Sequence, residues 1–208
     1  MNSKKIKGTK DAIKYIENNL INKIFEFFKT GKYEANPLEY MEFYSTVQIV
    51  CDEDPLDSNY PSSKEFYEYY KQTIENYIID CKKKLINEGK DNIIDAFLLH
   101  TNNIKFLIYQ LQRVFCYLDR FYISYTKTRK SLSEIAFDLY KLLFYEEFKD
   151  KIQEEINNLK KDEKNGNEEL NTKIQSIMKI EEDMKLVKPY IDKDKGNKEI
   201  IWRNEGRY

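Results

Sequence analysis

The residues that could carry out catalysis are few in this sequence. His100 is the single histidine, so any Ser-His or Cys-His pair would have to use it. It falls inside a predicted helix, and the pattern around it does not suggest a nucleophile, a base and an orienting group in one place. The paired carboxylates Glu146-Glu147 and Glu154-Glu155 stand beside lysines, as solubilising charges on helix surfaces do. We therefore predict no catalytic residues and no enzyme activity.

Cofactor and metal sites are not predicted either. The six glycines are dispersed at predicted helix ends and loops, so none forms the glycine-rich turn that cradles a phosphate. Three cysteines, Cys51, Cys81 and Cys116, lie far apart within helical patterns. Their odd number and wide spacing favour neither disulfides nor a zinc site, and we expect reduced, mostly buried thiols.

The side chains best suited to a function are those that bind protein, and they occur in residues 36–51. If this stretch is a helix, one arc is apolar and a neighbouring arc carries tyrosine and methionine. Aromatic residues and methionine are enriched where proteins bind each other. The second arc is therefore interpreted as a docking surface, the alternative being that both arcs are buried in a larger bundle. The apolar arc holds Phe43, Val47 and Val50, and the neighbouring arc holds Pro37, Tyr40, Met41, Tyr44 and Gln48.

The start of that helix has strong signals. Asn36 is suited to cap the first free amides, and Pro37 fits the first helical position. Glu39 stands where a capping-box carboxylate would reach back to the cap amide.

Charge and composition exclude several classes of partner. The 208 residues have a net charge of −1 with acidic and basic residues interspersed, so no broad positive field is available for nucleic acid or an anionic membrane. No stretch reaches 18 apolar residues, and residues 1–10 lack the apolar centre of a secretory signal. We expect a protein of the cytoplasm and nucleus.

Helical periodicity runs through nearly the whole chain and predicts an all-α fold of about seven helices. Capping boxes are expected at Ser62 with Glu65 and at Ser131 with Glu134. Thr101 to Asn103 compete with the backbone for hydrogen bonds and are expected to separate the fourth helix from the fifth. The predicted helices cover residues 9–31, 36–51, 62–89, 92–101, 104–126, 131–160 and 168–188.

Several motifs resemble the amino-terminal region of cullins. Residues 40–47, Tyr-Met-Glu-Phe-Tyr-Ser-Thr-Val, resemble the second-helix motif of that family, and residues 117–123, Tyr-Leu-Asp-Arg-Phe-Tyr-Ile, resemble its fifth-helix motif. Residues 66–71 are similar to the third helix. Residues 163–166 and 170–174 resemble the stretch that joins the first two helices of the second cullin repeat. Within the family, the chain is most similar to the cullin of Skp and F-box type ubiquitin ligases.

The resemblance implies an elongated helical bundle of cullin-repeat type. Residues 9–130 would form a first repeat of five helices with an adaptor-binding tip, residues 131–190 the start of a second repeat, and residues 191–208 a polar tail. The implied function is that of a scaffold arm in ubiquitin-dependent protein degradation. The implied partners are a Skp-like or BTB-fold adaptor and, through it, a substrate receptor.

A RING-box protein is also implied, through a carboxy-terminal cullin region onto which no residue of this sequence maps. We expect either a piece of a longer cullin or a divergent short form. The alternative function is an unrelated helical rod, such as a tethering subunit. Only a docking protein would need Tyr44 and Tyr122 close together on an exposed surface, so their placement distinguishes the two.

Carried over residue by residue, the adaptor contacts of the family fall on helix two and helix five. Gln48 stands where relatives often carry an aromatic residue, which bears on the identity of the adaptor. The alternatives are that Met41 fills the core and that Tyr122 packs on Leu118. The adaptor-binding residues implied are Tyr40, Met41, Tyr44, Gln48 and Tyr122.

Because the second repeat would have only two helices, part of their apolar surface is expected to lack cover. Such surface would favour self-association or docking of Ile200-Ile201-Trp202 from the tail. The expected uncovered residues are Leu139, Leu143, Ile152, Ile156, Ile174 and Ile177.

Overall fold

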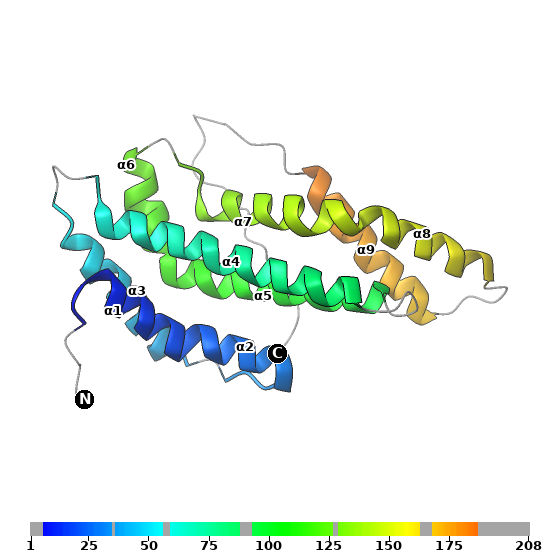
Figure 1. The fold of residues 1–208 in the computed structure, drawn as a ribbon, viewed down its shortest axis with the longest axis horizontal. Coiled ribbons are helices and arrows are strands. Elements are labelled where there is room, and N and C mark those ends of the chain that lie inside the picture. The colour runs from blue at the N-terminus through cyan, green and yellow to red at the C-terminus, as the bar shows by residue number, and fades with distance from the viewer. Residues whose placement is uncertain are drawn as a thin grey trace. The chain divides into compact units, whose positions relative to one another are not determined.

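The computed structural model describes residues 6–34, 36–55, 59–87, 93–126, 129–162 and 168–186, and the regular structure within them is helical (Figure 1). The all-α prediction is confirmed. The helices are α1 (Gly8–Ile16), α2 (Asn22–Thr30), α3 (Pro37–Asp52), α4 (Pro61–Asn87), α5 (Ile93–Leu118), α6 (Ser124–Thr126), α7 (Leu132–Tyr140), α8 (Glu146–Asp162) and α9 (Glu168–Leu186).

Wider π-helical turns join some of these helices without a break. They lie at Glu17–Ile21 between α1 and α2, at Asp119–Ile123 between α5 and α6, and at Lys141–Tyr145 between α7 and α8. The described residues therefore form six continuous helical segments rather than the seven predicted. Among these helices, none combines the length and the apolar content needed to span a bilayer.

The break predicted at Thr101 to Asn103 is wrong, because α5 runs through it. Thr101 is fully buried, and its Oγ1 lies 3.0 Å from the hydroxyl oxygen of Tyr140 on α7, within hydrogen-bond distance. Its side chain thus has a partner distant in the sequence, so it does not interrupt the backbone of its own helix.

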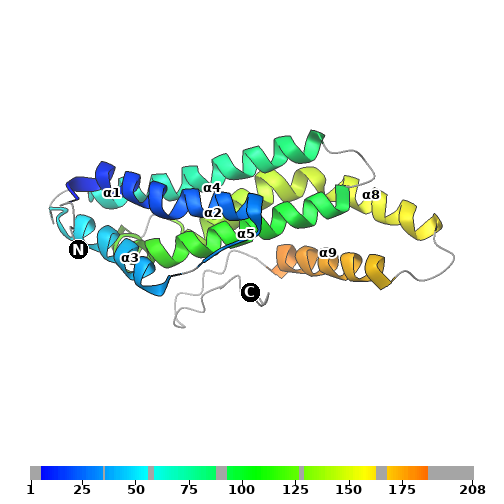
Figure 2. The same ribbon diagram turned by 90° about the horizontal axis from the view of Figure 1, so that it is seen from below.

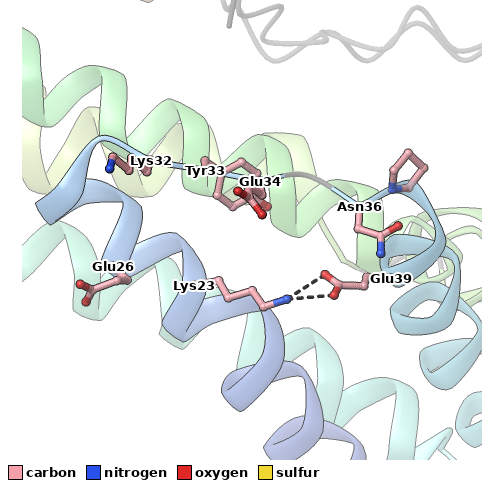
Figure 3. Close-up of a pocket in the computed structure, with 8 residues that line it drawn as sticks. Lys23, Glu26, Lys32, Tyr33, Glu34, Asn36 and Glu39 are labelled. Atoms are coloured by element: carbon pink, nitrogen blue, oxygen red, sulfur yellow. Dashed lines mark hydrogen bonds and ion pairs between the residues drawn. The ribbon is translucent and has the colours of Figure 1, made fainter.

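The predicted start of α3 is confirmed in part. The Oδ1 atom of Asn36 accepts a hydrogen bond of 3.0 Å from the amide of Leu38, and Pro37 is the first helical residue. Glu39 does not form the expected capping box. Its carboxylate accepts bonds of 3.0 and 2.9 Å from Nζ of Lys23 on α2, as Figure 3 shows. The carboxylate thus joins two helices and leaves the cap to Asn36.

The capping box predicted at Ser62 and Glu65 is also wrong, because α4 begins at Pro61. The first free amides of α4 are satisfied by Asp54 instead, whose carboxylate accepts bonds of 2.9 Å from the Ser62 amide and 3.0 Å from the Ser63 amide. A carboxylate there also interacts favourably with the helix dipole.

At the start of α7, the predicted capping box is confirmed. The Ser131 amide donates to the Glu134 carboxylate over 2.7 Å, and the Glu134 amide donates to Ser131 Oγ over 3.2 Å. The next amide, that of Leu132, donates to the carboxylate of Asp119 in the π-helical turn over 2.9 Å. This start is therefore fixed to the end of the preceding helix.

The chain divides into two compact units. The first comprises Met1–Ile74 and Phe106–Ile135, and the second comprises Glu75–Lys105 and Ala136–Tyr208. Because α4 and α5 each contribute to both units, each unit contains segments far apart in sequence. The repeat boundaries at residues 130 and 190 stay a prediction.

In the first unit, the continuous helix formed by α1 and α2 packs on α3 and α5 (Figure 2). The Tyr15 ring lies 5.6 Å from that of Phe43 on α3, and the Phe27 ring lies 4.9 Å from that of Phe106 on α5. These contacts bring α3 and α5 against the same helix.

In the second unit, aromatic rings form the core between α5 and the long α7–α8 segment. Phe97 of α5 stacks on Phe144 at 5.5 Å between ring centroids, and Phe144 contacts Phe148 at 5.3 Å. On the other side of α5, Lys173 of α9 forms an ion pair of 2.9 Å with Asp95. The residues Ile93–Lys105 of α5 thus contact both the π-helical turn before α8 and helix α9.

The expectation of an uncovered apolar stripe on the last two helices is wrong for four of its six residues. Ile152, Ile156, Ile174 and Ile177 are all buried. Leu139 and Leu143 are half-buried. Because the four isoleucines are buried, they give no reason to expect self-association there. The tail segment Ile200-Ile201-Trp202 lies outside the described residues.

Gly31 allows a prediction about the end of α2. It adopts the left-handed conformation with φ +70° and donates a bond of 2.8 Å to the Phe27 carbonyl oxygen. A Cβ there would meet no atom within 4 Å, so only the backbone conformation opposes a side chain. We expect Gly31→Ala to lower the free energy of unfolding by about 1 kcal/mol in urea denaturation. Gly31→Asn should cost less, since asparagine tolerates this conformation; equal losses for the two variants would contradict the explanation.

Candidate functional site

The helix α3 has a buried face and an exposed face. Phe43, Val47 and Val50 are buried, as the apolar arc predicts. Burying three such side chains contributes several kcal/mol and fixes the rotation of the helix about its axis. The remaining positions of α3 are thereby turned outward.

Met41 has the clearest place on the outer face, with 65% of its surface exposed. The alternative that Met41 fills the core is therefore wrong. Tyr44 and Gln48 are half-buried beside it. Leu38 and Ile49 are also exposed apolar residues, and the predicted docking arc omitted both. They lie three and eight residues from Met41, spacings that place them on its side of the helix, so the sequence could have predicted their exposure.

Tyr40 does not lie on the exposed face, contrary to the prediction. Only 6% of its surface is exposed. Its hydroxyl donates to Oε1 of Gln110 on α5, and its ring lies under the Arg113 guanidinium, with Cζ 3.9 Å from the ring centroid. The hydroxyl of Tyr33 is hydrogen-bonded to that of Tyr40. Three side chains from two parts of the chain thus hold Tyr40 inward.

The direction of these hydrogen bonds follows from protonation. Burial raises the pKa of Tyr40 well above its usual value, and the bond with Tyr33 raises it further. Burial also raises the pKa of Tyr33. Both hydroxyls therefore stay protonated at neutral pH, so Tyr40 gives its single proton to Gln110 and accepts one from Tyr33.

The helices predicted as two and five pack against each other, since α3 lies alongside the C-terminal half of α5 (Figure 2). Besides the Tyr40 to Gln110 bond, the ring centroids of Tyr44 and Tyr117 lie 6.5 Å apart. At the end of α3, the Asp52 carboxylate accepts a hydrogen bond from the Tyr117 hydroxyl. The contacts extend along the length of α3.

Tyr122 does not share an exposed surface with Tyr44, so the exposed pair expected of a docking protein is not present. It is 3% exposed, with its ring centroid 6.2 Å from that of Tyr60 and 6.1 Å from that of Tyr67 on α4. The Arg129 guanidinium lies 5.3 Å from its centroid. Tyr122 thus belongs to the interior of the first unit, and the exposed aromatic residue next to it in sequence is Phe121.

A hollow of about 570 Å³ lies beside the start of α3 (Figure 3). Its lining is mostly charged and includes Glu26, Lys32 and the Lys23 to Glu39 ion pair. Small-molecule sites are mostly apolar with a few polar groups, and this lining is the reverse. The hollow therefore does not suggest a substrate pocket.

The histidine and the cysteines, which are the residues that could act in catalysis, are mostly buried in the fold. His100 is buried in α5. Burial raises the pKa of the Cys51 thiol to about 12 and that of Cys81 to about 11, so both stay protonated and are poor nucleophiles. Cys116 is partly exposed. Within the residues described, no group of three or more His, Cys, Asp or Glu side chains could hold a metal ion.

Comparison with known proteins defines the class. Residues 14–193 match the family described as the cullin alpha solenoid domain, so the chain belongs to the cullin family. Cullin-1 of Oryza sativa subsp. japonica is similar to it, with 29% identity over 129 residues. The alignment covers 62% of this chain and 17% of the rice protein, so the chain matches only a small part of that relative. No solved structure matches the chain.

Because Tyr40 is buried, its substitution is expected to destabilise the fold. Tyr40→Ala removes a buried ring and two hydrogen bonds, and we expect it to lower the free energy of unfolding by about 3 kcal/mol. Met41→Ala is the matched control. Met41 is next to Tyr40 in the sequence but exposed, so its truncation should lower the free energy of unfolding by less than about 0.5 kcal/mol. Urea denaturation followed by circular dichroism measures both. A Tyr40→Ala variant as stable as Met41→Ala would show that the Tyr40 contacts contribute little.

Proposed function

We propose that this chain is a non-catalytic scaffold arm of a cullin-RING ubiquitin ligase and binds a Skp-like or BTB-fold adaptor through α3 and the end of α5. In this proposal the adaptor brings a substrate receptor, while a RING-box protein binds another part of the scaffold. The complex would act in the cytoplasm and nucleus. Membership of the cullin family favours this proposal over an unrelated helical rod. The placement of Tyr44 and Tyr122 does not, because Tyr122 is buried.

The observation that carries the proposal is the outer face of α3. Met41 is exposed beside the half-buried Tyr44 and Gln48, on a helix whose other face is fixed in the core. A flexible methionine beside an amphipathic tyrosine supplies contact area that can adapt to the surface of a partner. The Tyr44 ring also contacts the ring of Tyr117 on α5.

The other predicted contacts take different roles in the proposal. Tyr40 and Tyr122 are buried, so each would act by holding its helix in place rather than by touching the adaptor. Gln48 would contribute at the edge of the contact, where its amide can donate and accept hydrogen bonds. The adaptor surface that fits is apolar at its centre and polar at its rim.

Substitution of Met41 tests the proposal. We expect Met41→Ala to weaken binding of the Skp-like adaptor about tenfold, because central contacts commonly contribute more than 1 kcal/mol. Isothermal titration calorimetry with the 208-residue chain measures the dissociation constant. Leu142→Ala is the matched control, since Leu142 is equally exposed but lies in the second unit. Equal affinities for the wild type, Met41→Ala and Met41→Glu would refute the proposed site.

A further inference from the structure

The helix α9 is attached to α5, within the second unit, by an ion pair near each of its ends. Near its start, Nζ of Lys173 lies 2.9 Å from Oδ1 of Asp95. Near its end, Oδ2 of Asp183 lies 3.5 Å from Nζ of Lys105. The two pairs are ten residues apart on both helices and occur in the same order, so α9 runs parallel to α5. A reversed α9 would bring like charges together at both ends, so the pairs fix its direction.

One side of α9 is apolar and buried along the whole helix. Its residues recur every three or four positions, as on one face of a helix. Burial of this side is the main contribution to the docking of α9, and the ion pairs decide how its two ends differ. The buried residues are Leu170, Ile174, Ile177, Ile180 and Met184.

The two ion pairs differ in how much water reaches them. At the start of α9, the Asp95 side chain is 56% exposed, and bonds with Glu169 and Asp95 raise the pKa of Lys173. These bonds therefore stabilise the Lys173 charge. At the end of α9, the Lys105 side chain is only 20% exposed. Burial lowers the pKa of Lys105 although Asp183 acts against this, so its charge is not fully compensated.

The surroundings of Lys105 add to this cost. Lys179 of α9 also lowers the Lys105 pKa by charge repulsion. Asp183 belongs to three consecutive acids, residues 181–183, near the C-terminal end of α9, where the helix dipole is negative. Burial raises the pKa of Tyr140, and the nearby Asp183 charge raises it further, so this hydroxyl stays neutral. Docking of this end therefore moves charged groups from water to a site that solvates them less well.

We propose that α9 is a strap whose C-terminal half, residues 180–186, opens from α5 while its N-terminal half stays docked. On opening, the Lys105 ammonium and the Asp183 carboxylate return to water, which partly offsets the exposure of Ile180 and Met184. The aromatic core between α5 and the α7–α8 segment stays intact. Opening thus changes the surface of the second unit without unfolding it, and it does not depend on the proposed function of α3.

Native-state hydrogen exchange of the 208-residue chain in low urea measures the opening at each amide. In the wild type, we expect residues 180–186 to exchange at least tenfold faster than residues 174–179. Lys105→Met removes the buried charge, while Asp183 is 40% exposed and stays hydrated, so exchange of residues 180–186 should slow at least threefold. Asp183→Asn removes the carboxylate beside the buried ammonium and should speed that exchange at least threefold.

Lys173→Met is the matched control, because Lys173 also links α9 to α5 but lies at the hydrated end. It should leave exchange of residues 180–186 unchanged. If Lys105→Met speeds their exchange as Asp183→Asn does, the buried ion pair holds α9 closed and the inference is overturned. Unchanged exchange in both variants would mean ordinary fraying of a helix end and would overturn it as well.

The wild type alone also decides the question if Lys105→Met does not fold. The inference requires that residues 180–186 exchange through an opening smaller than global unfolding. Their exchange should then depend less on urea than that of residues 97–104 in the core of the second unit. Equal rates and equal urea dependence for the two stretches would show that the strap opens only when the whole unit unfolds, which contradicts the inference.

Discussion

The attachment of α3 to α5 is the constraint on which the candidate site depends. Near its start, α3 is held by the bond from Tyr40 to Gln110, and at its end by the bond between Asp52 and Tyr117. Between these points Phe43 and Val47 are buried. A helix fixed at both ends and along one face has one possible rotation, and that rotation exposes Met41. The exposure of the proposed docking surface therefore follows from core packing rather than from any feature of the surface alone.

Much of the fold could be predicted from local sequence signals. The periodicity identified the helices, and the Asn36-Pro37 and Ser131 to Glu134 signals identified two starts because each acts within a few residues. The failures involve partners distant in sequence. Thr101 did not break α5 because its partner is Tyr140, and Asp54 rather than a local box caps α4.

The candidate site was predicted less well, and the reason is geometric. A helical wheel orders residues by angle but does not give the angle at which the core begins. Tyr40 and Met41 were therefore placed on one arc, although the first is buried and the second exposed. The same ambiguity placed Tyr122 on an exposed surface, although Tyr122 is buried and its neighbour Phe121 in the π-helical turn is exposed. Buried polar partners such as Gln110 decide the assignment, and their identity is set only by the tertiary structure.

The central claim is that the adaptor binds the outer face of α3 together with the end of the α5–α6 segment. Hydrogen–deuterium exchange of the 208-residue chain, alone and saturated with the Skp-like adaptor, tests it most directly. The account predicts slower exchange on binding for the amides of Pro37–Asp52 and of residues 117–126, and unchanged exchange in Glu168–Leu186. Protection of α9 with none in α3 would contradict it.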